Sequence, residues 1–327
     1  MKLSILDQSP ISSGKSPQEA LQASVELAKA ADKIGYTRYW MAEHHDLTGL
    51  ACPNPDVMLG IVGSQTERIR IGAGAVLLPH YKPYKVAETY NLLATLYPGR
   101  VDLGIGRAPG GSAEASMALS GNFLENVKQM PEKLDELLQF LHNDFSEENM
   151  YAKINPSPVP AVSPETWLLG TSEKSADLAV EKGLPYVFGH FMSDADGPSI
   201  VKKYKESGSK TIVTVSAVCA ETTEEAQELA LSSQLWNVQR AKGEGDGKVP
   251  SVDASKVYSF SEEELETVSR MKQKMIVGNP REVRQQLEQL QARYDTDEIM
   301  VVTITHSYKA RLRSYELIAE EMMEGKR

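Results

Sequence analysis

A run of ionisable residues, Glu43-His44-His45, follows a short aromatic segment, 36–42, which is expected to form a strand after the helix-ending Gly35. In folds that alternate strands and helices, the carboxyl ends of the strands carry the catalytic groups. A histidine at such an end is therefore a candidate general acid or base near neutral pH. A structural role for a lone histidine is the alternative.

Successive residues of an extended chain point to opposite sides, so His44 and His45 are not expected to act on one reacting centre. The same geometry disfavours a metal site, because a metal needs ligands that converge on one ion. We therefore expect one of these histidines to be functional and the other structural, with no metal bound between them.

The segment 101–111, VDLGIGRAPGG, predicts a strand that ends in glycine and arginine. It resembles a dinucleotide-binding fingerprint, but its third glycine falls one position late, Pro109 stands in its place, and no helix starts immediately. Arg107 still suits an anion, because a guanidinium group pairs with phosphate through two hydrogen bonds. A surface arginine in a loop is the alternative.

A second candidate anion site follows the strand that is expected to end at Gly170. A helix is predicted from about residue 172 to 183, and the N–H groups and dipole at its start favour a phosphate. Thr171, Ser172 and Ser175 add hydroxyl groups at the same place. Simple capping of the helix by these residues is the alternative.

Glycines interrupt a third predicted strand in the segment 71–78, IGAGAVLL. Glycine inside a strand usually marks a bulge or the close approach of another group, and a flat ligand needs such backbone exposure. Two further histidines, His190 and His306, follow later strands and are expected near the same rim, either in the site or as ordinary loop residues.

The elements that must position these groups alternate along the chain. Helix starts are marked by Ser16-Pro17-Gln18-Glu19 and by Asn279-Pro280-Arg281-Glu282, each with a capping pattern and proline in the first turn. Eight strands are predicted, at about 2–7, 37–42, 69–77, 101–106, 165–170, 185–189, 211–219 and 298–304.

Parallel strands joined by helices must be covered on both faces, and eight strands favour a closed (β/α)8 TIM barrel of the α/β class over an open doubly wound sheet. We expect one domain over residues 1–327. Irregular insertions are expected around 143–164, which is rich in proline, and around 240–260, which is rich in Gly, Lys, Asp and Ser. The second is interpreted either as a lid over the barrel mouth or as a solvated insertion.

Composition limits the partners. The net charge of −10 disfavours nucleic acid or an anionic membrane as the main partner. Two cysteines provide neither a disulfide framework nor a zinc motif. The start of the sequence lacks a signal-peptide pattern, and no apolar run has the length of a membrane span. A cytoplasmic protein is the expectation.

Taken together, these motifs resemble those of the luciferase-like flavin-dependent monooxygenases, the bacterial luciferase and alkanal monooxygenase superfamily, over essentially the whole chain. The segments that carry the resemblance are WMAEHH at 40–45, GAGAVLLP at 72–79, YPGRVDLGIGR at 97–107, and the stretch 170–185, which begins GTS and ends GLP.

The resemblance implies a (β/α)8 barrel that takes reduced FMN as a cosubstrate, often from a separate flavin reductase. Oxygen then forms a C4a-peroxyflavin that oxidises a small organic substrate. By position, His44 matches the catalytic histidine of the family and Arg107 the arginine that binds the FMN phosphate. The remaining cofactor-binding positions implied are Thr171, Ser172 and Ser175 at the phosphate, and Gly74 and Ala75 at a non-proline cis peptide under the flavin ring.

One departure concerns the residue before Arg107, where luciferases carry cysteine and this chain has Gly106. Light emission is therefore not implied. The resemblance favours a homodimer or larger homo-oligomer, and it identifies no substrate. A non-catalytic flavin-binding protein and a deazaflavin-dependent hydride-transfer enzyme on the same fold stay open, with a metal-dependent hydrolase a more distant alternative.

Overall fold

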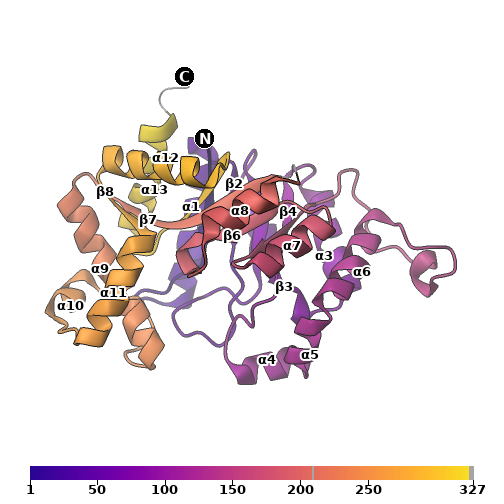
Figure 1. Cartoon of the computed structure of the whole chain (residues 1–327), viewed down its shortest axis with the longest axis horizontal. Helices are drawn as coiled ribbons and strands as arrows, with labels where there is room; N and C mark the ends of the chain where they lie inside the picture. Colours follow the sequence, from indigo (N-terminus) through magenta and orange to yellow (C-terminus); the bar gives the residue numbers. More distant parts are fainter. Residues whose placement is uncertain (208–209, 324–327) are drawn as a thin grey trace.

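Eight parallel strands close into a barrel in the computed structural model, which describes residues 1–207 and 210–323 (Figure 1). The expected domain of 1–327 thus includes a few residues, 208–209 and 324–327, that lie outside the described part. Each strand pairs in parallel with its neighbour, and pairings between β6 and β7 and between β1 and β9 complete the ring. In order around the barrel the strands are β1 (Lys2–Asp7), β2 (Arg38–Met41), β3 (Arg70–Leu77), β4 (Val101–Gly106), β5 (Glu165–Gly170), β6 (Tyr186–Gly189), β7 (Thr211–Cys219) and β9 (Glu298–Val302).

These eight strands are the predicted ones, with small differences at their ends. The sequence prediction lacks a ninth strand, β8 (Met275–Gly278), which pairs with the last residues of β7 outside the ring. The first part of β7 pairs instead with β9. Because β8 has only four residues and continues directly from a helix, neither its length nor its flanks mark it as a strand.

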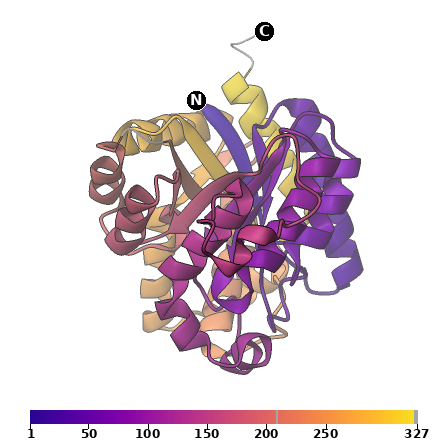
Figure 2. The ribbon, with the colours of Figure 1, turned by 90° about the vertical axis from the view of Figure 1, so that its right-hand side faces the viewer.

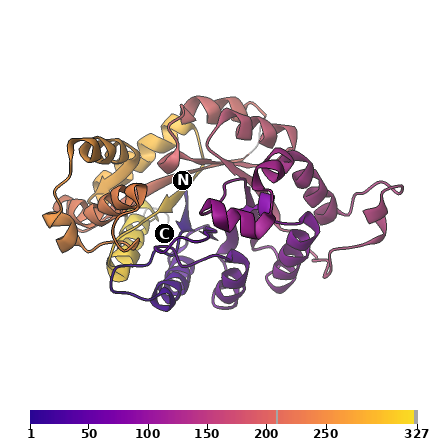
Figure 3. The ribbon, with the colours of Figure 1, turned by 90° about the horizontal axis from the view of Figure 1, so that it is seen from below.

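Helices surround the barrel, as the view from below shows (Figure 3). Those that connect consecutive strands of the ring, or end the chain, are α1 (Pro17–Ile34), α2 (Pro55–Ser64), α3 (Pro83–Leu96), α6 (Met130–His142), α7 (Glu173–Glu181), α8 (Gly197–Lys205), α12 (Pro280–Tyr294) and α13 (Tyr308–Met323). Short 3₁₀ helices are η1 (Leu78–His80), η2 (Met150–Lys153) and η3 (His190–Met192). The remaining helices belong to two insertions: α4 (Ala113–Ser120) and α5 (Phe123–Lys128) after β4, and α9 (Thr223–Lys242), α10 (Val252–Val257) and α11 (Glu262–Lys274) after β7.

The inserted helices α4 and α5 lie at the lower end of the molecule in Figures 1 and 2, opposite the end at which the N-terminus lies, and α9, α10 and α11 extend along the left side of Figure 1 towards the same end. Because the strands are parallel and β1 starts at the N-terminus, this lower end collects their carboxyl ends. The loops that could carry a site are therefore enclosed by α4 and α5 on one side and by α9, α10 and α11 on the other.

The helix starts predicted from capping patterns are confirmed. Ser16 and Glu19 form a reciprocal capping box before α1, and Gly35 ends that helix in a left-handed conformation with φ of 105°. Asn279 and Glu282 form the same arrangement before α12. Local hydrogen bonds over a few residues thus set these boundaries.

The two expected insertions differ in their structure. The first, 143–164, is irregular apart from η2. The second, 240–260, contains the end of α9 and the short helix α10, and its Val249 is fully buried. The Val249 N–H donates to the carbonyl of Ile11 (2.9 Å), and its carbonyl accepts from the Ser13 N–H (2.8 Å). Backbone hydrogen bonds therefore hold this segment against the residues that follow β1.

A cluster of buried charges fills the barrel at the amino ends of the strands. Asp102 accepts hydrogen bonds from Nη1 of Arg38 (2.7 Å), Nε1 of Trp40 (2.9 Å) and Nε of Arg70 (2.9 Å). Arg38 also donates through Nε to Glu298 (3.0 Å), and its guanidinium lies 4.6 Å from the centre of the Trp167 ring. Each buried charge thus has several partners, which offsets its loss of hydration.

We predict that Asp102→Asn lowers the free energy of unfolding by about 3–5 kcal/mol, because it leaves Arg38 and Arg70 without their shared buried carboxylate. Urea denaturation followed by circular dichroism measures this change. Asp135→Asn is the matched control, since Asp135 is half exposed in its ion pair with Lys182 and should contribute less than about 1 kcal/mol. Equal losses in the two variants would contradict the prediction.

Candidate active site

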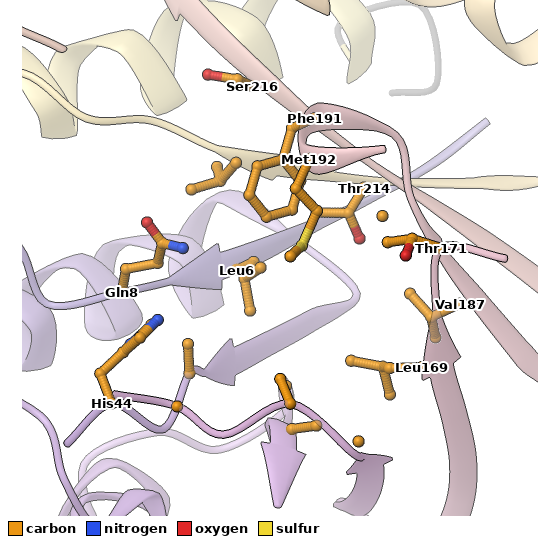
Figure 4. A pocket seen from close by; sticks show the side chains of 18 of the residues that line it. Leu6, Gln8, His44, Leu169, Thr171, Val187, Phe191, Met192, Thr214 and Ser216 are labelled. Carbon is orange, nitrogen blue, oxygen red and sulfur yellow. The ribbon is translucent and has the colours of Figure 1, made fainter. Parts of the chain in front are cut away.

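A cavity of about 630 Å³ opens at the carboxyl ends of the strands. Its wall combines residues from β1, the loop after β2, the strands β3 to β9, and the inserted helices α9 and α11. Apolar side chains form much of the surface, among them Leu6, Leu169, Val187 and Phe191, as Figure 4 shows. A mostly apolar, concave site with a few polar groups is typical of small-molecule binding.

His44 comes from the loop after β2 and lines this cavity (Figure 4). Its Nδ1 is buried and has no hydrogen-bond partner among the described residues. Burial, followed by the electrostatic effect of Arg240 and His45, lowers the pKa of His44 to about 4. The sequence analysis expected a histidine that titrates near neutral pH, whereas this environment keeps the imidazole neutral at pH 7.

His45 is not among the residues that line the cavity, and it contacts Glu43. Its Nε2 lies 2.8 Å from Oε1 of Glu43, a carboxylate that also accepts hydrogen bonds from the Tyr81 hydroxyl (2.6 Å) and the Leu77 N–H (3.2 Å). Glu43 therefore ties the loop after β2 to the end of β3 and to the residues beyond η1. Successive side chains of an extended segment point to opposite sides, so separate surroundings for the two neighbouring histidines are expected.

Gly74 and Ala75 line the cavity, and the peptide bond between them is cis, as the resemblance implies. The pairing of β3 with β4 shifts register between Ala73 and Val76 at the same place. The glycines inside this strand predict such a break in the regular strand pairing. On the next strand, a Cβ at Gly104 would lie only 2.2 Å from the carbonyl oxygen of Ala73, so the backbones approach too closely for a side chain.

The predicted anion-binding residues meet at another part of the cavity. Arg107, Thr171, Ser172 and Ser175 all line it, and they come from the ends of β4 and β5 and the start of α7. Arg107 forms no ion pair with any carboxylate in the described part of the chain. Burial raises the pKa of the Tyr186 hydroxyl to about 12. The positive charge of Arg107 acts in the opposite direction on this pKa.

The serines in this group also cap the helix. The Ser172 N–H donates to Oγ of Ser175 (3.2 Å), and that Oγ donates to the carbonyl of Ser172 (2.6 Å) and lies 2.8 Å from the Tyr186 hydroxyl. The capping interpretation is therefore correct for Ser172 and Ser175. It leaves the anion interpretation open, because the first N–H groups of α7 still point out of the helix start.

Two other histidines named in the sequence analysis lie outside the residues that line the cavity. Nδ1 of His190 lies 2.9 Å from the Tyr294 hydroxyl, and Nε2 of His306 lies 3.1 Å from the carbonyl of Ser13. Both are held by contacts with neighbouring elements, which corresponds to the ordinary-loop alternative.

The sequence analysis missed several residues that line the cavity, namely Gln8, Phe191, Met192, Trp236 and Arg240. Gln8, Phe191 and Met192 lie just after strands, where their position is a signal but their residue types are not. Trp236 and Arg240 lie on the inserted helix α9, far from any strand end, so the rule that located the other residues does not reach them.

Comparisons with known proteins agree with this geometry. A family model described as luciferase-like monooxygenase matches residues 1–297. The chain belongs to the luciferase-like monooxygenase family. Its relatives include the uncharacterized protein YceB of Bacillus subtilis (strain 168), 40% identical over 97% of this chain and 98% of the relative. The N-acetyl-S-alkylcysteine monooxygenase of the same organism is 33% identical, with 100% of each chain covered.

Among solved structures, apo-MsnO8 is similar with a TM-score of 0.87 and 32% identity over 98% of each chain. The oxygenating constituent of a 3,6-diketocamphane monooxygenase from Pseudomonas putida, in complex with FMN, has a TM-score of 0.73 and 22% identity over 99% of this chain and 98% of that one. An F420-dependent secondary alcohol dehydrogenase has a TM-score of 0.68 and 16% identity over 98% of this chain and 97% of that one. The similarity to the last two structures shows a common fold only.

Membership of this family supports the assignment of the protein as an oxidoreductase of the monooxygenase class. Among the described helices, none combines the length and the apolar character that crossing a membrane requires.

The lowered pKa of His44 predicts a contribution to the pH dependence of stability. Between pH 6.5 and 4, the unfolded chain binds a proton at His44 and the folded chain does not, so stability falls as the pH falls through this range. We expect the wild type to lose about 3 kcal/mol more than His44→Gln between these pH values. Urea denaturation at a series of pH values measures the difference. His142→Gln, at an exposed position, is the control that should keep the wild-type profile, and equal profiles for wild type and His44→Gln would contradict the prediction.

Proposed function

We propose that this protein is an FMN-dependent monooxygenase that uses reduced flavin and O2 to oxidise a small organic substrate. The observation that carries the proposal is one cavity that brings together an unpaired arginine with a helix start, the backbone of Gly74 and Ala75, and a neutral histidine. A phosphate, a flat ring and a reacting centre need these three kinds of surface.

The phosphate end would be held by Arg107, Thr171, Ser172 and Ser175. The fit is supported by the unpaired guanidinium of Arg107 and by the start of α7, where the helix dipole favours an anion. The failed dinucleotide motif at 101–111 agrees with a protein that binds no NAD(P)H itself. We therefore propose a two-component system, in which a separate reductase supplies the reduced flavin.

The ring end would lie against Gly74 and Ala75, which line the cavity and are joined by the cis peptide bond. Leu6, Leu169 and Val187 give the cavity an apolar wall that excludes water. When bound, reduced FMN supplies the electrons with which one atom of O2 is transferred to the substrate. The task of the apolar wall is to keep water and stray protons away from that reaction.

His44 is proposed as the catalytic residue. Its buried Nδ1 has no partner among the described residues, so this atom is available to a ligand in the cavity. A neutral imidazole can accept a hydrogen bond or a proton at one ring nitrogen and donate from the other. Because its pKa is about 4, His44 can do so at pH 7 without a fixed positive charge.

The family membership also motivates the remaining proposals. A single catalytic domain over 1–327 and a homodimer or larger assembly are expected of this chain. N-acetyl-S-alkylcysteines, named for one relative, are reasonable first compounds in a substrate screen. A deazaflavin-dependent hydride transfer is the second candidate function, because a solved structure of similar fold uses F420.

We predict that Arg107→Ala weakens binding of FMN by about 1.5–3 kcal/mol, the contribution of a charged hydrogen bond. Isothermal titration calorimetry with FMN and with riboflavin measures the effect, and only the phosphorylated ligand should lose affinity. Arg270→Ala is the control, because Arg270 is exposed on α11 and lies outside the cavity lining. Unchanged affinity for FMN in Arg107→Ala would place the phosphate elsewhere.

Anaerobic titration with reduced FMN, followed by rapid mixing with O2 and product analysis, tests the proposed function directly. The wild type should bind reduced FMN and delay the return of oxidised-flavin absorbance. His44→Ala should bind FMN equally well and lose about 100-fold or more in substrate oxidation, the scale of general acid–base catalysis. His306→Ala, outside the cavity lining, should retain it.

The outcomes separate the alternatives. Equal turnover in His44→Ala would remove the catalytic role of this residue. Preference for the deazaflavin over FMN would favour hydride transfer, and binding of FMN without any oxidation would favour a flavin-binding protein.

A further inference from the structure

A second arginine, Arg240, lies in the last turn of α9 and lines the same cavity as His44. Its positive charge is close enough to His44 to lower the pKa of that imidazole, after the larger effect of burial. Arg240 is exposed at the mouth of the cavity, and no carboxylate of the described residues forms an ion pair with it. A guanidinium group at this place is free to bind an anion that enters.

The charge balance of the cavity is positive in a chain whose net charge is −10. Its basic lining residues are Arg107, Arg240 and Lys274, and its acidic one is Glu43. Lys274 is paired with Asp194, and the carboxylate of Glu43 is engaged by His45, Tyr81 and the Leu77 N–H. Two guanidinium groups, those of Arg107 and Arg240, therefore remain without a counter-ion.

These two arginines belong to different parts of the cavity. Arg107 follows β4, and Thr171, Ser172 and Ser175 follow the neighbouring strand β5, whereas Arg240 lies on α9 and its charge acts on His44. Figure 4 shows His44 and Thr171 on opposite sides of the cavity, with Leu6 between them. The phosphate of one bound flavin accounts for Arg107 and leaves the charge of Arg240 for a second ligand.

The position of Arg240 is supported by the aromatic ring next to it. Its guanidinium lies 5.2 Å from the centre of the Trp236 ring, which is 2% exposed. Nε1 of Trp236 donates to the carbonyl of Gly247 (2.7 Å), so the loop after α9 holds the ring in place. A guanidinium stacked on a fixed ring loses less freedom when it binds a carboxylate, and its planar fork matches the two carboxylate oxygens.

We propose that the substrate of this enzyme is a small organic carboxylate, bound through its carboxylate group by Arg240 beside His44. This inference rests on the proposed function, which defines the substrate as the compound that the enzyme oxidises. A carboxylate at the mouth directs the rest of the molecule inward, along the apolar wall that includes Phe191 and Met192. The group to be oxidised then lies within the cavity, which His44 also lines, and the charged end stays at Arg240.

Titration of the FMN-loaded protein with matched acids and amides tests this proposal. The first pair is N-acetyl-S-benzylcysteine and its carboxamide, and the second pair is hexanoate and hexanamide. The two compounds of each pair differ chiefly in their charge. By calorimetry, we expect the wild type to bind the acid of at least one pair ten or more times more tightly than its amide. In Arg240→Met this preference should fall to less than twofold, and Arg240→Lys should restore at least a threefold preference.

Arg270→Met is the matched control, because it removes an exposed arginine of the neighbouring helix α11 and should leave the preference unchanged. Binding of acids and amides with equal affinity by the wild type would overturn the proposal. Full retention of the preference in Arg240→Met would do the same. Loss of FMN affinity in Arg240→Met as large as in Arg107→Ala would instead assign Arg240 to the cofactor.

Failure of the proposed function gives a different result. If the wild type binds no FMN, the flavin assignment is wrong, and the acid and amide titrations are then performed on the protein alone. Acid preference that depends on Arg240 under those conditions would still support an anion site at this position, and its absence would reject the inference as well.

Discussion

Closure of the parallel barrel is the constraint on which the rest of the structure depends. Pairings of β1 with β9 and of β6 with β7 leave no free edge in the ring, so all carboxyl ends of its strands lie on one rim. The interior is filled from the opposite end by the ion pairs around Asp102 and then by the rings of Trp40 and Trp167, which lie 5.9 Å apart. Space for a ligand therefore remains at the carboxyl ends, where the insertions after β4 and β7 enclose it.

The electrostatics of the cavity differ from those of the chain as a whole. An acidic protein presents two unpaired guanidinium groups to one cavity, and the same cavity keeps His44 neutral. Burial and positive charge act in the same direction on an imidazole, because both disfavour its protonated form. The arrangement suits anionic ligands that approach a neutral hydrogen-bonding group.

Much of the site could be predicted because its residues follow strands directly. His44, Arg107 and Ser172 come one to three residues after a strand, and parallel strands bring such positions together regardless of their separation in sequence. The neutral state of His44 could not be predicted in this way, since it arises from burial by other elements. Arg240 was missed because it lies on an inserted helix, and β8 because its four residues continue from α11.

The sequence by itself determined the local features: the capping boxes before α1 and α12, the left-handed helix end at Gly35, and the interrupted strand at Gly74. Hydrogen bonds and steric limits within a few residues decide these. Only the tertiary structure decided that His44 rather than His45 lines the cavity, and that Arg240 lines it too without a counter-ion among the described residues. Exposure, pKa and charge pairing depend on residues that are distant in the chain and meet only when the barrel closes.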